Sequence, residues 1–355
     1  MASSRPTKSF IAFSHQSVRA ASVGVLCLAL GLGCIAPTPA HAAAEESDLL
    51  FGQTALQHGI PVRSGPDLEA SYASVLDEGG DLCFGRRATD QAQIASLTKI
   101  MTAIVALETL SPDAAIEVTP TAASVGESSA GLMQGDVMTL DASLKALLTA
   151  SGNDAATALA EAAGTIILAD QGLSGDGYAC QAAFVDAMNA KGSALGLVNT
   201  CFTNPHGLDF DAWAQGQYSC AQDVAVMLRY GMGIERFRAS IGFSNVDIAV
   251  NRNGSETTLS LSNTDTMLQT YEGTCAAKTG YTLAAGPCVA TAVNRGDGHE
   301  YYAVVLGSSS KPQRFADSET LYDWTYATRE TRATLPWHKR IGLWIDYALD
   351  TAASI

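Results

Sequence analysis

One stretch decides how this sequence is interpreted: Ile94-Ala95-Ser96-Leu97-Thr98-Lys99-Ile100-Met101-Thr102-Ala103. It places a serine and a lysine three positions apart, where an apolar run predicts a helix from about Ser96 to Leu110. Residues three apart share one face of a helix, so the two side chains can meet. A serine becomes a nucleophile when a base takes its proton. Lys99 can be that base if burial or a nearby cation lowers its pKa, and its apolar neighbours favour burial.

A lone Ser-x-x-Lys pair also arises by chance, usually as a capped helix start, so the interpretation depends on the rest of the chain. Two more stretches supply polar groups suited to the same chemistry. Ser151-Gly152-Asn153 falls between two expected helices, and Lys278-Thr279-Gly280 ends an expected strand just before a turn. Taken separately, these residues would be helix caps and turn residues. In this order they supply a nucleophile, two lysines and two hydroxyls, which favours one catalytic cleft.

The bulk composition predicts an ordered, acidic protein with one large domain. The chain has 355 residues, of which 47% are hydrophobic and 16% charged, so a sizeable core can be buried. Its net charge of -15 argues against nucleic acid as a partner, because binding phosphates requires a basic surface.

The first 42 residues have the pattern of a secretory signal peptide. Arg5, Lys8 and Arg19 occur without any acidic residue, and an apolar run follows at 20–35. That run is short for a membrane span, and Ala40-His41-Ala42 resembles a cleavage site. We therefore expect export with cleavage near Ala42, and an uncleaved anchor is the alternative.

Six cysteines remain beyond this segment, and an even number in an exported chain suggests disulfides with fifteen possible pairings. Cys275 with Cys288 is favoured because the two residues flank the Lys-Thr-Gly stretch and its turn. Cys201 with Cys220, and Cys83 with Cys180, are guesses. No Cys-x-x-Cys or His-x-x-x-His pair occurs, so neither a metal site nor a cofactor is expected.

The pattern of elements predicts an α+β fold, in which an antiparallel β-sheet is flanked by helices and carries a helical subdomain. A hairpin is expected at 71–84 around Glu78-Gly79-Gly80, and a second at 288–306 around 294–298. Helices are expected between these hairpins and after the second one. Residues 45–65 are expected to form a polar leader with a few apolar anchors. Helices are expected at 140–150, 151–163, 182–188, 222–230 and 314–329, with a loop at 168–179. The catalytic domain is expected at 45–330, followed by a tail at 331–355 that could be helical.

The three motifs, in this order on an exported chain, are the signature of penicillin-binding proteins and class A β-lactamases. Together with 95–103, 119–132, 202–208, 262–268 and 277–289, they resemble the serine D-alanyl-D-alanine carboxypeptidases, over about 71–329. The resemblance implies a serine β-lactamase/transpeptidase-like fold. It also implies a penicillin-sensitive enzyme of the extracytoplasmic cell envelope, in the cell wall space or periplasm. Its substrate would be the peptidoglycan pentapeptide, and β-lactams would be inhibitors.

The resemblance also assigns roles to residues. Ser96 is the nucleophile, Lys99 its general base, and Ser151 the relay that passes a proton to the leaving group. The remaining assignments concern substrate binding: Asn153, Lys278, Thr279, Gly280 and Tyr281.

Alternatives stay open on the same scaffold. A DD-endopeptidase would use the same residues, whereas a class A β-lactamase needs a Glu-x-x-Leu-Asn motif that does not follow Ser151. His206 is expected to be a structural loop residue and Asp154 a first-turn helix acid. The segment 337–345 is expected either to pack on the domain or to make a peripheral membrane contact. The oligomeric state is left open.

Overall fold

The computed structural model describes residues 45, 47–54, 65–214 and 216–334. Chain contacts separate Met1–Ala40 from His41–Ile355, and the fold below belongs to the second unit. The expected signal peptide and residues 335–355 lie outside the described residues. Among the described residues, no helix combines the length and the apolar composition needed to span a membrane.

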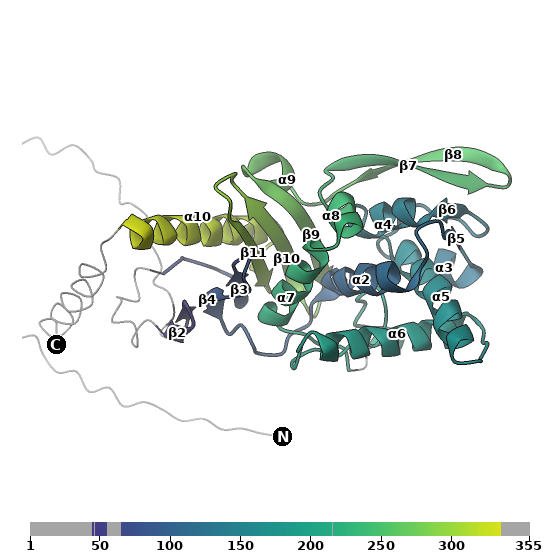
Figure 1. Ribbon diagram of the computed structural model, residues 1–355, viewed down its shortest axis with the longest axis horizontal. Helices are drawn as coiled ribbons and strands as arrows, with labels where there is room; N and C mark the ends of the chain where they lie inside the picture. Colours follow the sequence, from purple (N-terminus) through teal and green to yellow (C-terminus); the bar gives the residue numbers. More distant parts are fainter. Residues whose placement is uncertain (1–44, 46, 55–64, 215, 335–355) are drawn as a thin grey trace, which may run out of the picture. The chain divides into compact units, whose positions relative to one another are not determined.

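A seven-stranded antiparallel sheet forms the larger framework, with strand order β2-β1-β4-β3-β11-β10-β9 (Figure 1). Both expected hairpins are present in it, β3 paired with β4 and β10 paired with β11. β11 joins them by pairing with β3, so the early and late parts of the chain share one sheet. The strands are β1 (Leu49–Leu50), β2 (Gln53–Thr54), β3 (Tyr72–Leu76), β4 (Leu82–Arg86), β9 (Thr274–Thr282), β10 (Gly286–Asn294) and β11 (Glu300–Leu306).

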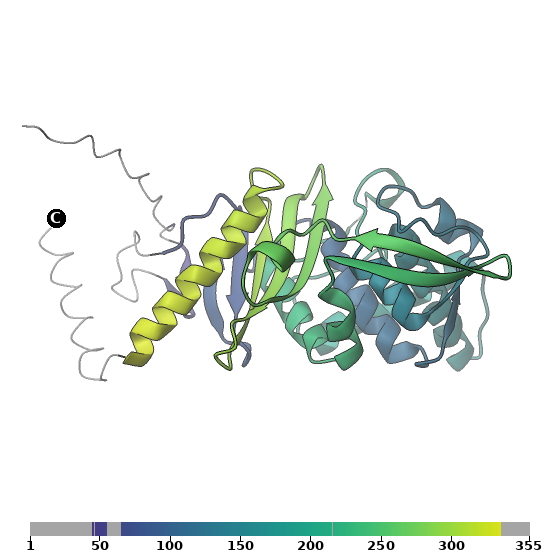
Figure 2. The same ribbon diagram turned by 90° about the horizontal axis from the view of Figure 1, so that it is seen from above.

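This sheet is buried on both faces, as the continuous apolar runs of β10 and β11 predict. Alternate residues of a strand point to opposite faces. Tyr302, Val304 and Leu306 therefore enter a core shared with the helical part, where α7 (Ala221–Met232) lies. Tyr301, Ala303 and Val305 enter a second core with α10 (Gln313–Thr334), which crosses the sheet in Figure 2. The closing helix was expected at 314–329, so its existence is confirmed and its end extends further.

A helical subdomain lies beside the sheet, with α2 at its centre (Figure 1). All residues from Lys99 to Ala106 are buried, because other helices surround α2. The elements of this part are η2 (Ala95–Thr98), α2 (Lys99–Thr109), α3 (Pro120–Ser124), α4 (Leu140–Leu148), α5 (Asn153–Asp170), α6 (Gly177–Ala194) and α8 (Glu235–Ile241).

The helices α5 and α6 are longer than expected, so the loop predicted at 168–179 is confirmed only for its central half, residues 171–176. α5 continues to Asp170, and α6 begins after Asp176, whose Oδ1 accepts the Ala179 N–H at 3.0 Å. Gly164 does not interrupt α5, because α6 crosses it very closely. A Cβ atom at Gly164 would lie 2.0 Å from the Cys180 carbonyl oxygen, so this glycine serves helix packing.

A second, smaller sheet has the order β5-β6-β7-β8 and includes a long β-ribbon that the sequence analysis missed. The ribbon turns at Asn253-Gly254, where both residues have positive φ, +54° and +81°. Asn-Gly is a common two-residue hairpin turn, so a signal for it was present in the sequence. The strands are β5 (Ala115–Glu117), β6 (Val137–Thr139), β7 (Asn245–Arg252) and β8 (Ser255–Ser262), and two short helices complete the fold, η3 (Asp211–Trp213) and α9 (Met267–Thr270).

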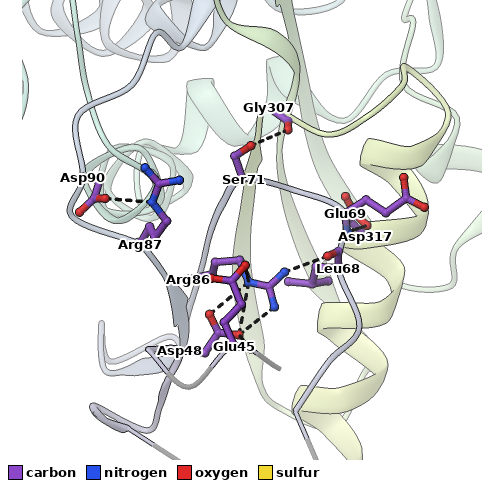
Figure 3. Close-up of polar contacts among 10 residues, drawn as sticks. All are labelled: Glu45, Asp48, Leu68, Glu69, Ser71, Arg86, Arg87, Asp90, Gly307 and Asp317. Atoms are coloured by element: carbon purple, nitrogen blue, oxygen red, sulfur yellow. Dashed lines mark hydrogen bonds and ion pairs between the residues drawn. The ribbon is translucent and has the colours of Figure 1, made fainter. Parts of the chain in front are cut away.

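The described part of the expected polar leader is an edge of the main sheet, so that prediction is wrong for residues 48–54. β1 pairs with β4, and the Asp48 carboxylate beside it is fully buried. Figure 3 shows Arg86 of β4 reaching this carboxylate, with an Nη2–Oδ2 distance of 2.8 Å and an Nε–Oδ1 distance of 3.1 Å. Arg86 also donates to the Leu68 carbonyl at 2.8 Å. A buried ion pair therefore fastens this segment to the sheet.

The disulfide predictions are wrong, since the six cysteines beyond the expected signal are free thiols. In the β9–β10 hairpin Cys288 lies opposite Gly280, whereas Cys275 lies near the other end, beside Ala292. Five residues of extended strand separate the two positions, about 16 Å.

The other two proposed pairs fail for related reasons. The backbone of Cys201 forms an isolated β-bridge with that of Tyr218, two residues before Cys220. The Cys220 thiol caps α7 by accepting the Asp223 N–H. Cys83 is on β4 and Cys180 on α6, where the Cys180 Sγ contacts the Thr165 hydroxyl at 3.4 Å.

Candidate active site

Lys99 is the centre of the site, and none of its surface is exposed. Its Nζ lies 2.8 Å from Ser96 Oγ, 2.7 Å from Asn153 Oδ1 and 2.6 Å from the His206 carbonyl oxygen. Burial first, and then the positive charge of Lys278, lower the pKa of Lys99 well below its usual value, although Asp154 opposes this. The structure therefore brings Ser96 and Lys99 together as the spacing predicted.

The hydrogen-bond partners of Lys99 determine where the lone pair of its neutral amine points. The Asn153 oxygen is oriented by its own amide, whose Nδ2 donates to the Gly126 carbonyl at 2.9 Å. This oxygen and the His206 carbonyl can only accept, so they take the two N–H bonds of a neutral amine. Its lone pair is then left for the Ser96 hydroxyl proton, which is the arrangement a general base requires.

The segment between α4 and α5 brings Asn153 and Ser151 to this centre. Asn153 begins α5, and its N–H donates to the Ser128 carbonyl at 2.8 Å. Asp154 is 4% exposed and accepts the N–H groups of Ala130 and Leu132, so it organises the opposite loop as well as the first helical turn. Ser151 has φ +58°, a left-handed conformation that costs a non-glycine residue about 1 kcal/mol or more.

Lys278 projects from β9 to the Ser151 hydroxyl, with an Nζ–Oγ distance of 2.7 Å. Its ammonium also donates to the Thr279 carbonyl at 2.7 Å, and the residue is 1% exposed. Burial and the charge of Arg314 lower the pKa of Lys278 to about 7, with Asp265 acting in the opposite direction. The second lysine is thus coupled to the second serine.

Two glycines, Gly207 and Gly280, allow their chain segments to pack closely against the backbone at Ala95 and Ser96. A Cβ at Gly280 would lie 3.2 Å from the Ser96 nitrogen, and one at Gly207 would lie 2.0 Å from the Ala95 carbonyl oxygen. Gly207 also has φ +91°, a conformation that disfavours other residues. A side chain there is therefore excluded both by the contact with Ala95 and by the backbone conformation. Ala95 itself is held at φ +48°. Strain therefore lies immediately before the nucleophile and at Ser151.

The backbone of Tyr281 points out of the sheet toward this region. β9 is the edge strand, and Tyr281 lies opposite Pro287 of β10. The Pro287 carbonyl accepts the Ser308 N–H at 3.1 Å, so it is turned away from β9. Since this pair makes no mutual hydrogen bonds, the Tyr281 N–H is directed to the free edge. With the Ser96 N–H it can form the pair of donors that an oxyanion needs.

Thr279 follows Lys278 on the edge strand β9, and its Oγ1 lies 2.7 Å from Thr264 Oγ1. Thr264 was missed by the sequence analysis, as were Asp265 and Arg314. Arg314 Nη1 donates to the Gly280 carbonyl at 3.1 Å, and burial raises the pKa of Asp265 to about 6. These residues occur outside the three motifs. Thr264 and Asp265 lie within 262–268, which carries part of the family resemblance, so a signal for that segment was present although neither residue was singled out.

His206 contributes its backbone rather than its ring. Its Nδ1 accepts the Leu208 N–H at 3.2 Å, and its ring packs edge-on against Trp213 with centroids 5.2 Å apart. Burial and the neighbouring Lys99 lower its pKa to about 3, so the imidazole is neutral. Sequence reasoning expected a structural residue but missed that its carbonyl holds Lys99.

The groups gathered here suit acyl transfer: a nucleophile beside a neutral amine, a second hydroxyl–lysine pair, and two backbone donors at a strand edge. In the part of the chain that the structure describes, no three His, Cys, Asp or Glu side chains are grouped as metal ligands would be.

Comparison with known proteins gives the same chemistry. Residues 62–310 match the family model described as D-alanyl-D-alanine carboxypeptidase, peptidase S11. The chain is 31% identical over 278 residues to the D-alanyl-D-alanine carboxypeptidase DacF of Bacillus subtilis, a match covering 77% of this chain and 65% of that protein. It is 30% identical over 294 residues to a D-alanyl-D-alanine endopeptidase of Pseudomonas aeruginosa, covering 76% and 83%.

Among solved structures, the fold is similar to the crystal structure of the Streptomyces K15 DD-transpeptidase, with 28% identity and a TM-score of 0.67. That match covers 74% of this chain and 99% of the other. The expected α+β, transpeptidase-like fold is confirmed.

Proposed function

This chain belongs to the family of D-alanyl-D-alanine carboxypeptidases, and from that premise we propose that it removes the terminal D-alanine of peptidoglycan pentapeptides. The reaction passes through an acyl-enzyme on Ser96. The observation that carries the proposal is the environment of Lys99, a buried amine whose two acceptor-only partners leave a lone pair for the Ser96 proton.

Acylation begins when Lys99 takes the Ser96 proton and Oγ attacks the carbonyl carbon of the penultimate D-alanine. The oxyanion that forms accepts hydrogen bonds from the N–H groups of Ser96 and Tyr281. Losing one such donor typically lowers kcat by about 10²–10³-fold. Lys278 and Thr279 bind the terminal carboxylate, and Asn153 binds the peptide while orienting Lys99.

The C–N bond then breaks, and the departing amine of D-alanine receives the proton that Lys99 took from Ser96, passed on through the Ser151 hydroxyl, which Lys278 holds at 2.7 Å. Lys99 is thereby neutral again for the second half of the reaction. Water next attacks the ester, returning the proton to Ser96 and releasing the shortened peptide. A β-lactam opens on Ser96 in the same way and leaves an ester that water cleaves slowly, so we expect the enzyme to be inhibited by penicillins.

The compartment and the partners follow from the substrate. Peptidoglycan stem peptides lie outside the cytoplasmic membrane, so we propose that the mature protein works in the cell envelope after export. Cleavage near Ala42 belongs to the same proposal.

The test combines a fluorescent penicillin with a peptide ending in D-Ala-D-Ala. The wild-type protein should be labelled covalently and should release D-alanine, and Ser96→Ala should do neither. Rapid turnover of penicillin without release of D-alanine would identify a β-lactamase instead.

The endopeptidase relative and the transpeptidase fold give two close alternatives, which differ in what is cleaved or in what accepts the acyl group. Supplying a cross-linked dimeric peptide tests the first, and supplying a glycine-based amine acceptor tests the second. Faster release from the dimer, or transfer to the amine in preference to water, would replace the carboxypeptidase assignment.

A further inference from the structure

We propose that Asp209 is a specificity-determining residue that binds a cationic side chain on the substrate residue preceding the two D-alanines. The inference rests on the proposed function, which fixes the direction of the peptide in the cleft. It adds a preference for an ammonium-bearing residue at that position.

The position of Asp209 follows from two chain segments that start at the nucleophile and stay in contact as they run away from it. Gly207 and Gly280 both lie against the Ala95–Ser96 backbone. Two residues further along each segment stand Asp209 and Thr282, and the Thr282 hydroxyl donates to Asp209 Oδ2 at 2.6 Å. Two extended residues span about 7 Å, so Asp209 stands about that far from the backbone contact with Ser96.

Alternate residues of β9 establish which end of the peptide Asp209 faces. Lys278, Gly280 and Thr282 share one face of the strand, since side chains alternate. Gly280 lies against the nucleophile, Lys278 is two residues before it and Thr282 two residues after it. With the terminal carboxylate at Lys278 and the scissile carbonyl at the Tyr281 N–H, the peptide continues toward Thr282 and Asp209. The residue preceding the two D-alanines is the next one in that direction.

The charge of Asp209 suits a cation there. The residue is half-buried, and its Oδ1 has no hydrogen-bond or ion-pair partner among the residues that the structure describes. At the opposite end of the cleft the Lys278 ammonium supplies positive charge beside Ser151, so the site is positive at the carboxylate end and negative at the other. Thr282 is 6% exposed and also accepts the Ala285 N–H at 3.0 Å, which fixes its hydroxyl toward Asp209.

The experiment compares two peptides, acetyl-lysyl-D-Ala-D-Ala with a free ε-amine and the same peptide with that amine acetylated. Each peptide is assayed by how well it slows acylation of Ser96 by fluorescent penicillin, so the readout does not depend on release of D-alanine. The free-amine peptide should compete about fivefold better with the wild-type protein, the value of a partly exposed ion pair near 1 kcal/mol. Asp209→Asn should reduce that ratio to about one.

Asp211→Asn is the matched control, because Asp211 is an exposed carboxylate on the same loop with φ +50°, a conformation that asparagine tolerates. It should keep the fivefold ratio. Thr282→Val should reduce the ratio and Thr282→Ser should restore it, as expected of a positioning residue.

Equal competition by both peptides with the wild-type protein overturns the inference, and so does a ratio that survives Asp209→Asn. Release of D-alanine is measured separately, so a protein that discriminates between the peptides but hydrolyses neither contradicts the proposed function alone.

Discussion

Arg86 and Lys99 are both buried basic side chains, but their surroundings differ. Arg86 faces the fully buried carboxylate of Asp48 in a bidentate contact, drawn in Figure 3. Burial alone would lower its pKa, but the hydrogen bond and charge of Asp48 outweigh burial and raise it. Lys99 makes its three hydrogen bonds to uncharged oxygens, and its pKa falls.

The same fold uses the cost of burying charge in two ways. A carboxylate in direct contact turns a buried cation into an attachment point for a peripheral strand. Without one, the same burial drives the cation toward its neutral form and produces a base. Substitutions at Arg86 and its partner should therefore change stability, and substitutions at Lys99 should change catalysis.

The largest expected effect is on the rate of acylation. Lys99→Arg keeps a cation and its donors, but a guanidinium does not lose its proton, so no base remains for Ser96. We expect acylation by fluorescent penicillin to slow about 10²–10⁴-fold, the range of general-base catalysis, with the protein still folded. Arg86→Lys is the control and should acylate normally. Acylation by Lys99→Arg within threefold of wild type would refute the role of Lys99.

The next effect is on stability. Asp48→Ala leaves Arg86 buried without its partner and should lower the free energy of unfolding by about 3–5 kcal/mol, measured by urea denaturation. Asp90→Ala removes the partner of Arg87 in an ion pair whose side chains are 46% and 52% exposed, and it should cost less than about 1 kcal/mol. Similar losses in the two variants would show that burial does not distinguish these pairs.

The third effect is a pH dependence. Lys278 has a pKa of about 7, so it is charged below pH 7 and neutral above it. If its ammonium reads the substrate carboxylate, kcat/KM for the peptide should fall about tenfold per pH unit above pH 7 once that limb dominates. Lys278→Arg stays charged, so that fall should vanish even if overall activity is lower. A basic limb that persists in Lys278→Arg would assign it to another group.

The smallest effect is expected at His206. Its ring is neutral with a pKa of about 3, and only its backbone carbonyl contacts Lys99. His206→Asn can still accept the Leu208 N–H, so acylation should change less than about threefold and stability by about 1 kcal/mol. The pH profile should keep its shape. A lost inflection would instead show that the imidazole takes part in proton transfer.

Much of this architecture could be predicted because its signals are local. The three motifs and the turn at 294–298 are short, and each places its residues by spacing alone. The ends of α5 could not be predicted, because whether Gly164 stops a helix depends on how closely α6 approaches. The contribution of the His206 carbonyl has no sequence signature, since every residue carries one.

Two errors were avoidable. Counting outward from the turn at 283–285 places Cys288 opposite Gly280, which excludes the bond to Cys275. Asn253-Gly254, flanked by alternating apolar and polar residues, predicts the β7–β8 hairpin. By contrast, the buried pair of Asp48 and Arg86 joins residues 38 apart, and only the pairing of β1 with β4 reveals it.

The pairing of β3 with β11 has a consequence for how this protein acquires activity. Tyr302 lies opposite Leu76, more than two hundred residues earlier in the chain, so the sheet closes only after β11 has been synthesised. Such long-range closure slows folding, because the loop must close before its contacts are gained. The nucleophile is made early, but β9 and its lysine cannot be held in place until the neighbouring strands arrive. A nascent chain therefore carries Ser96 in an inert form, and labelling by penicillin reports completed folding as well as chemistry.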